Sequence, residues 1–153
     1  MLKIDKTDRS IINLLLKDSR MSSLEIGRKT GLSHDAVRYR IEKLVKEGVI
    51  KNFSVEIDPA KLGLNIWADV IISVWNLNPK RYAEFIAYLK SHPNIAAVWN
   101  LSGRYEWFIE VFAPDLDKFN EITTELKLKF SDIIKDFESA FVLKEVKSYS
   151  YPV

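Results

Sequence analysis

The 153-residue sequence contains no cysteine. This absence excludes disulfide bonds, thiolate-bound zinc, iron–sulfur clusters and cysteine nucleophiles. Histidine is scarce as well: His34 and His92 share no local motif, which leaves little for a metal site or for proton transfer. With only five glycines and five prolines, long flexible stretches are few. We therefore expect a folded chain with no metal and no cofactor.

Long apolar runs are also missing. No stretch approaches the roughly 18 apolar residues of a membrane span, and the N-terminal residues lack the apolar core of a signal peptide. We expect a cytoplasmic protein that does not associate with membranes. The sequence contains no Gly-rich phosphate loop, no HExxH zinc motif and no GxSxG nucleophile motif. It therefore predicts a protein that is not an enzyme.

The charge that is present is unevenly distributed. Residues 1–50 hold 11 Lys and Arg against 7 Asp and Glu, a net charge of +4. Residues 51–153 hold 12 against 14, a net charge of −2, and the two parts sum to the +2 of the whole chain. All four tryptophans lie in the second part. This division predicts two domains with different tasks, the first of which faces an anionic partner.

The basic part reads as three helices. Apolar residues recur at helical spacing over residues 4–19, and Ser22 with Glu25 forms the capping box of a short second helix. Gly31 then supplies the left-handed position at which a helix stops, and Ser33 is a suitable N-cap for a third, longer helix. A short capped helix, a glycine turn and a longer helix with cationic exposed residues indicate a helix-turn-helix motif.

The second helix of such a motif lies in the major groove, so double-stranded DNA is the expected partner. Residues near its N-terminus would meet base edges, and basic residues would neutralise phosphates. Asp35 would be repelled by phosphates unless it caps the helix or accepts a hydrogen bond from cytosine. A three-helix bundle that binds a protein, or nothing, is the alternative. The candidate DNA-binding residues are Ser22, Ser23, Arg28, Lys29, Ser33, His34, Asp35, Arg38, Tyr39, Arg40, Lys43 and Lys46.

The second part predicts a βαββαβ order. Alternation of apolar and polar residues first predicts a half-buried strand over Ile50–Ile57, which leads away from the helices. The order of the later elements suits a ferredoxin-like fold of two split βαβ units. The predicted elements are strand Ile66–Trp75, helix Lys80–Lys90, strand Ile95–Leu101, strand Tyr105–Phe112, helix Leu116–Phe130 and strand Phe137–Lys147.

Two helices can cover only one face of a four-stranded sheet. The predicted first strand is apolar on both sides, with Ile66, Ala68, Val70, Ile72 and Val74 on one face. Trp67, Ile71 and Trp75 point to the other face. An exposed apolar area that contains them and the aromatic residues of neighbouring strands would be larger than a soluble monomer tolerates, so we expect two sheets to pack face to face in a dimer. The candidate dimer-interface residues are Phe53, Val55, Trp67, Ile71 and Trp75.

Several local patterns follow one another along nearly the whole chain. They are Ile4-Asp5-x-x-Asp8-x-x-Ile11-Ile12-x-x-Leu15-x-x-Asp18-x-Arg20, Glu25-Ile26-Gly27, Gly31-Leu32-Ser33, Val37-x-x-Arg40-Ile41-x-x-Leu44-x-x-x-Gly48-Val49-Ile50, Asp58-Pro59-x-x-Leu62-Gly63 and Gly103-x-Tyr105. Together these residues resemble the Lrp/AsnC, or feast/famine, transcription regulators. Gly27 stands where members of that family usually carry Ala, a difference expected to weaken the second helix only slightly.

The resemblance implies that dimers assemble into octamers or related rings, and that a small molecule, commonly an amino acid, binds near a Gly-x-Tyr-Asp turn. Here the turn reads Gly103-Arg104-Tyr105-Glu106, with Glu in place of Asp. The candidate effector-binding residues are Gly103, Tyr105, Glu106, which would hold an ammonium group, and Ser139, which would meet a polar ligand atom. Phe137, at a position that is often polar, would shrink the pocket. Alternatively, Gly103 only makes a hairpin turn and Glu106 is a solvated charge.

Taken together, the sequence predicts an α+β protein: a helix-turn-helix domain, winged or not, over residues 1–49, a hinge strand and linker over 50–64, and a ferredoxin-like sensing and oligomerisation domain over 65–153. The predicted function is sequence-specific transcription regulation as a homodimer or octamer, with an amino acid as the effector. A nucleoid-type architectural DNA-binding protein is one alternative. An enzyme like the sirohaem decarboxylases is another alternative. Those enzymes resemble the Lrp/AsnC proteins and use histidine and basic residues between their two domains, and this chain has no histidine in that region.

Overall fold

The computed structural model describes residues 4–75, 78–148 and 151–152. Contacts divide the chain into two units. One unit holds the residues up to Ile57 and those from Lys147 onward, and the other is Asp58–Val146. The division expected from the sequence placed the residues from Lys147 onward in the second domain. Residues 1–3 and Val153 of the chain lie outside the described residues.

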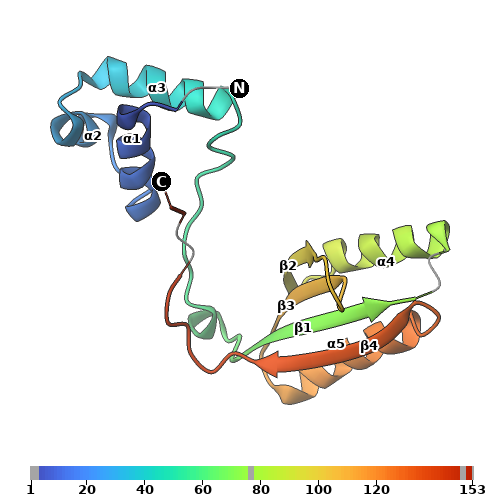
Figure 1. Cartoon of the computed structure of the whole chain (residues 1–153). Helices are drawn as coiled ribbons and strands as arrows, with labels where there is room; N and C mark the ends of the chain where they lie inside the picture. Colours follow the sequence, from blue (N-terminus) through green and yellow to red (C-terminus); the bar gives the residue numbers. More distant parts are fainter. Residues whose placement is uncertain (1–3, 76–77, 149–150, 153) are drawn as a thin grey trace. The chain divides into compact units, whose positions relative to one another are not determined.

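The first unit is a bundle of three helices: α1 (Lys6–Lys17), α2 (Ser23–Thr30) and α3 (His34–Lys46) (Figure 1). Each helix contributes one fully buried side chain to the common core, namely Ile11, Ile26 and Val37. Each also begins at an N-cap whose side-chain oxygen accepts a backbone N–H of the first turn. The three predicted helices are therefore confirmed.

The linker after α3 differs from the prediction. Residues 51–58 have no regular secondary structure, so the half-buried strand over Ile50–Ile57 is wrong for the single chain. The apolar side chains of its alternating pattern are exposed, with Phe53 at 51% and Val55 at 71%. A strand needs a neighbour to pair with its backbone, and no described segment forms a ladder with this one. The described residues up to Ile57 accordingly contain no wing strands either.

The second unit is a four-stranded antiparallel sheet in the order β2-β3-β1-β4, with two helices (Figure 1). This is the predicted βαββαβ order. Asp58 caps a short 3-10 turn at its start. The elements are η1 (Pro59–Leu62), β1 (Ile66–Val74), α4 (Pro79–Ser91), β2 (Ile95–Asn100), β3 (Trp107–Ala113), α5 (Leu116–Lys129) and β4 (Ile134–Phe141).

The last strand lies several residues earlier than the sequence predicted. It begins at Ile134, which pairs with Val74, and its ladder with β1 ends at Phe141, opposite Ala68. One further bond, from the Val142 N–H to the carbonyl oxygen of Trp67, closes the pairing. Because β1 begins at Ile66, the chain beyond position 142 has no partner strand in β1. The predicted extension to Lys147 is therefore wrong.

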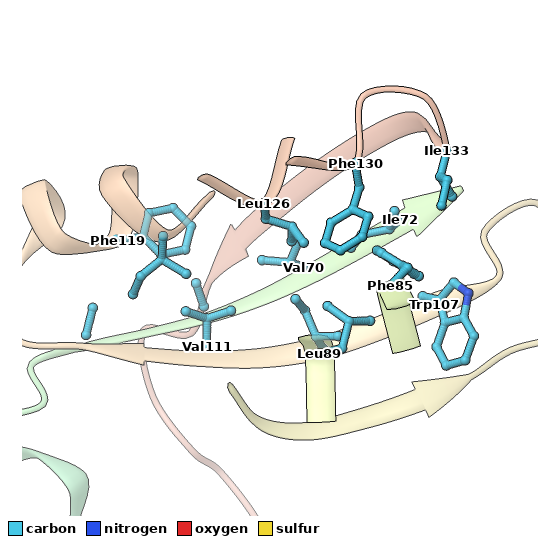
Figure 2. Close-up of a cluster of buried hydrophobic side chains, with 14 residues drawn as sticks. Val70, Ile72, Phe85, Leu89, Trp107, Val111, Phe119, Leu126, Phe130 and Ile133 are labelled. Atoms are coloured by element: carbon cyan, nitrogen blue, oxygen red, sulfur yellow. The ribbon is translucent and has the colours of Figure 1, made fainter. Parts of the chain in front are cut away.

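Both helices pack on the same face of the sheet, as Figure 2 shows. Ala68, Val70 and Ile72 of β1 are fully buried there, which confirms the predicted core face of this strand. The largest fully buried side chains there are Phe85 of α4 and Phe130, just after α5, whose ring centroids lie 5.2 Å apart. Neither α4 nor α5, the two described α-helices of this unit, covers the opposite face of the sheet, which is called the open face below. Among the described helices, none is long and apolar enough to cross a membrane.

Candidate nucleic-acid interface and ligand region

Caps at both ends of α2 and at the start of α3 fix the turn between these two helices. The Ser22 hydroxyl accepts from the Glu25 N–H at 3.2 Å, and the Glu25 carboxylate accepts from the Ser22 N–H at 3.0 Å. Gly31 ends α2 with φ 74°, a conformation that costs glycine nothing. Ser33 then caps α3 by accepting from the Ala36 N–H. The local sequence therefore determines where α3 begins and at which angle the chain enters it.

Gly27 has a role that the sequence did not reveal. A Cβ built on it would lie 2.6 Å from the carbonyl oxygen of Leu32, which is backbone and has little freedom to move. The Leu32 N–H also donates to the Gly27 carbonyl oxygen at 3.1 Å. The turn thus crosses directly over this residue. The expectation that Gly27 merely weakens α2 was incomplete, since the close approach requires glycine.

The outer side of α3 presents most of the candidate DNA-binding residues. Tyr39 is 67% exposed. Nδ1 of His34 lies 3.1 Å from Oδ1 of Asp35, and Nε of Arg38 lies 3.3 Å from the Glu42 carboxylate. These are exposed contacts that cost little to exchange for contacts with a ligand. Lys43 and Lys46, in the last turn of α3, are exposed as well.

Arg40 forms ion pairs within the first unit. Its Nη1 donates to Oδ2 of Asp5 and to Oδ1 of Asp8, both at 2.7 Å, which joins α3 to the N-terminus of α1. These two carboxylates raise the pKa of Arg40. The pKa of Asp5 is lowered, first by the Asp8 backbone N–H that it caps and next by Arg40. This geometry does not fit the predicted role of Arg40 as a phosphate partner.

The candidates on α2 fall into two groups. Arg28 and Lys29 are exposed in its last turn. Ser23 is half-buried, and the Ser22 hydroxyl both donates to Glu25 and accepts from its backbone. The two serines are therefore elements of the helix start, and only the two basic side chains are free to meet an anion.

The Gly103 turn lies at one end of the sheet. Gly103 has φ 145°, Tyr105 donates its hydroxyl proton to Glu138 of β4, and Glu106 accepts from the Val74 N–H at 2.9 Å. The Glu138 contact raises the pKa of Tyr105. One carboxylate oxygen of Glu106 thus closes the end of β1, so Glu106 is neither the solvated charge of one alternative nor wholly free for a ligand.

Ser139 is separated from this group. It pairs with Val70, whose side chain faces the helices, whereas Glu138 pairs with Ile71 on the open face. Because neighbouring strand residues alternate between faces, Ser139 and the Tyr105–Glu138 contact lie on opposite sides of the sheet. Phe137 also faces the core, where Nζ of Lys127 lies 4.1 Å from its ring centroid. The structure thus brings together Gly103, Tyr105 and Glu106 but not Ser139.

The open face carries aromatic rings at both ends of its central strands. Trp67 lies 5.3 Å from Phe112, and Trp99 lies 5.1 Å from Phe108, measured between ring centroids. Ile71 pairs with Phe108 on the same face. Trp75 is 57% exposed, but a register shift after Ser73 separates it from the regular alternation. The open face is therefore a broad apolar surface, as the sequence predicted from Trp67 and Ile71.

Two acidic residues lie in the middle of that face, and the sequence alternation placed Asp69 there but did not reveal its partner. Asp69 of β1 stands directly opposite Glu110 of β3. A signal was present, because Glu110 interrupts the apolar run between Phe108 and Phe112. Only the register of the sheet, however, places the two carboxyl groups together. Over the described part of the chain, no group of three or more His, Asp or Glu side chains could hold a metal ion.

Known protein families match both units. Residues 4–51 match a winged helix-turn-helix DNA-binding model, and residues 69–152 match the Lrp/AsnC ligand-binding domain. An uncharacterised HTH-type transcriptional regulator of Pyrococcus horikoshii is 32% identical over 98% of this chain and 92% of its own. The Bacillus subtilis regulator LrpC is 35% identical over 76% of this chain and 78% of its own.

Solved structures show the same fold. The structure of Bacillus subtilis LrpC superposes with a TM-score of 0.82 at 29% identity and covers 97% of this chain and 100% of that one. A transcriptional regulator of Neisseria meningitidis, crystallised with L-methionine, has a TM-score of 0.87 at 23% identity and covers 95% and 94% of the two chains.

Proposed function

This chain belongs to the Lrp/AsnC family of transcription regulators, and on that premise we propose that it binds two DNA half-sites as a homodimer, in the cytoplasm. The observation that carries the proposal is the exposed outer side of α3, which the Gly31 turn and the Ser33 cap hold in a fixed orientation. In a helix-turn-helix, this helix enters the major groove. His34, Asp35, Arg38 and Tyr39 would then meet base edges. Arg28, Lys29, Lys43 and Lys46 would contact phosphates.

Selection from a random duplex library at two salt concentrations tests this proposal. Enrichment of a pseudo-palindrome with half-sites about 10 base pairs apart is expected. Salt-sensitive binding without enrichment would instead indicate an architectural protein, and an absence of binding at both salt concentrations would contradict any role in DNA recognition.

A matched pair of lysines separates phosphate contacts from general charge. Lys43→Ala, in the last turn of α3, should weaken DNA binding and lower the salt slope of log K by about 1 for each half-site bound, and thus by about 2 for the dimer. Lys90→Ala, in the last turn of α4, removes the same charge from the second unit and should leave the slope unchanged. Equal effects of the two variants would show that α3 is not the DNA-contacting helix.

The open face of the sheet would form the dimer interface. Four strands spaced about 4.8 Å apart and about seven residues long present roughly 450 Å² per copy before side-chain relief is counted. Two such faces give roughly 900 Å², just below the 1,200 Å² at the lower end of specific interfaces. The exposed Phe53 and Val55 of the linker could supply the remainder. The surface is thus of the size that a second copy would cover.

Sedimentation measures this assembly directly. A dimer of the 17.7 kDa chain is expected at micromolar concentration, and octamers are a further possibility that the same experiment resolves. Ile71→Asp, on the open face, should weaken the dimer because it buries a further anion beside Glu138 and the acidic pair of Asp69 and Glu110. Leu128→Asp, at a 73% exposed position of α5, is the control that should leave it intact. A monomer under all conditions would contradict the proposal.

A small molecule, with an amino acid as the first candidate, is proposed to bind at the Gly103 turn. Support comes from the match to a ligand-binding domain and from the fold shared with the methionine-bound Neisseria regulator. Gly103 and the Tyr105 hydroxyl would contact the ligand. Glu106 would keep the end of β1 in place through its hydrogen bond from the Val74 N–H, and Ser139 would not take part in the site. Such a ligand shifts DNA affinity by no more than its differential affinity for the two assembly states.

Isothermal titration with each of the twenty amino acids tests the ligand site. Heat from at least one of them is expected. Tyr105→Phe should reduce that affinity because it removes the hydroxyl group that now contacts Glu138. Tyr151→Phe, at a 69% exposed position, is the matched control. No heat from any amino acid at millimolar concentration would exclude this class of effector.

A further inference from the structure

Asp69 and Glu110 form a directly opposed pair across the two central strands of the sheet. β1 and β3 are neighbours in the order β2-β3-β1-β4, and the two residues are Cα partners in their antiparallel ladder. Directly opposed side chains leave the same face of a sheet with Cβ atoms about 5 Å apart. The two carboxyl groups therefore lie within reach of one another in the middle of the open face.

Their surroundings offer no compensating charge. The Trp67–Phe112 and Trp99–Phe108 ring pairs flank them on the same face. The β4 residue opposite Asp69 is Ala140, and the titratable residues of β4 further along the same face, Glu138 and Asp136, are acidic. Among the described residues, the other charge that acts on Glu110 is that of Glu145, which is acidic as well. β2 contributes Ala97 and Trp99, neither of which titrates. Among the described residues, no hydrogen bond or ion pair joins Asp69 or Glu110 to a cationic side chain.

Charge is already disfavoured at this pair in the single chain. Oδ1 of Asp69 is buried and has no hydrogen-bond partner among the described residues. Burial raises the pKa of Asp69, and the nearby side chain of Trp67 offsets part of this effect. Burial also raises the pKa of Glu110, to which the charges of Asp69 and Glu145 add. A second sheet laid over this face would remove the remaining water, and two like charges so close together cannot both stay ionised cheaply in a dry interface.

We propose that Asp69 and Glu110 share one proton when a second copy covers the open face, so that dimerisation takes up protons and the dimer tightens as the pH falls. The inference rests on the dimer proposed above. A protonated carboxyl group donates a hydrogen bond to the ionised group opposite it, which satisfies both groups without a cation. Asp69 and Glu110 would thereby make assembly of this regulator, and with it paired binding to DNA half-sites, sensitive to pH.

The sign and size follow from linkage. Association raises the pKa of the pair, so the dimer binds more protons than two monomers do, and its dissociation constant falls as the pH falls. Each proton taken up changes the constant about tenfold per pH unit inside the window between the monomer and dimer pKa values. Two symmetric pairs per dimer give up to about a hundredfold change per unit.

Sedimentation of the full chain between about pH 5 and pH 8 tests the inference. The wild-type dimer should tighten progressively toward low pH. Glu110→Gln and Asp69→Asn replace the charge with a neutral group of the same shape, and each should tighten the dimer at pH 8 and flatten the pH profile. Glu121→Gln removes a carboxylate of α5 that pairs with Lys118 at 2.9 Å in an exposed ion pair, and it should leave the profile unchanged.

The outcomes separate the two proposals. A monomer at every pH would refute the dimer itself. A wild-type dimer of constant affinity across this range, or a Glu110→Gln variant that keeps the wild-type slope, would leave the dimer in place and overturn the proton linkage. Circular dichroism of each variant at both ends of the range confirms that the compared proteins are folded.

Discussion

Replacing Gly27 with alanine sets two physical effects of opposite sign against each other. By helix propensity alone, Gly27→Ala should stabilise α2 by about 1 kcal/mol. The structure predicts the reverse. The new Cβ would lie 2.6 Å from the Leu32 carbonyl oxygen, so the turn must move by at least about 0.8 Å to reach an ordinary contact distance. Overpacking of this kind costs about 1–3 kcal/mol, and the displacement also stretches the bond from Leu32 N–H to Gly27.

The net expectation is a destabilisation of about 1 kcal/mol, confined to the first unit. For a unit of this size, that corresponds to a fall in Tm of about 4–8 °C. The assay can separate the units because all four tryptophans lie in the second part of the chain. Far-UV circular dichroism follows helices of both units, whereas tryptophan fluorescence follows the sheet unit, which should be unaffected.

Gly31→Asn is the matched control. Gly31 has φ 74°, and no atom of the described residues lies within 4 Å of the position that a Cβ would take there. Asparagine tolerates that conformation. It should therefore cost less than Gly27→Ala. A Gly27→Ala protein whose first unit melts at a higher temperature than the wild type would refute the argument, because propensity would then outweigh the contact with the turn.

Three further predictions concern named hydrogen bonds. Arg40→Met should lower the urea midpoint of the first unit, because Asp5 and Asp8 lose their common partner, while the salt slope of DNA binding stays unchanged. A slope smaller by about 1 for each half-site bound would restore the phosphate role. Because the pKa of Asp5 is lowered from its ordinary value of 3.8, the ionised carboxylate stabilises the first unit at pH values above 3.8, and this stabilisation is lost as the pH falls through the lowered pKa. Asp5→Asn keeps the helix cap but does not titrate, so the stability of the first unit, followed by circular dichroism, should depend less on pH in acid. Glu106→Ala should destabilise the sheet unit by about 1 kcal/mol, measured by tryptophan fluorescence in urea, because the Val74 N–H loses its acceptor, whereas Glu106→Gln keeps an acceptor oxygen and should cost less.

Local signals in the sequence were sufficient for the helices and their caps. The capping box at Ser22 and Glu25, the stop at Gly31 and the N-cap at Ser33 depend on residues at most three positions apart, and all appear in the structure. The order of strands and helices was equally accessible from periodicity. These features depend on interactions between residues that are close in the sequence, so a single sequence is enough to predict them.

Relations between distant residues could not be read in this way. Arg40 meets Asp5 across 35 positions, and Asp69 meets Glu110 only through the strand register. The end of β4 depends on where β1 begins, and the alternating linker pattern around Val55 has no strand to pair with inside one chain. In each case a long-range partner, rather than local preference, determines the outcome.

The irregular linker also bears on how operators can vary. Residues 51–58 have no helix or strand, and eight residues reach at most about 28 Å when extended. Part of that reach is not free, because the Ser54 carbonyl oxygen accepts a hydrogen bond from Ser19 at 3.0 Å and the proposed dimer packs Phe53 and Val55 into its interface. The second half-site would then be bound at a high effective concentration only within a narrow range of distances, so regulatory DNA could change in length only within that range.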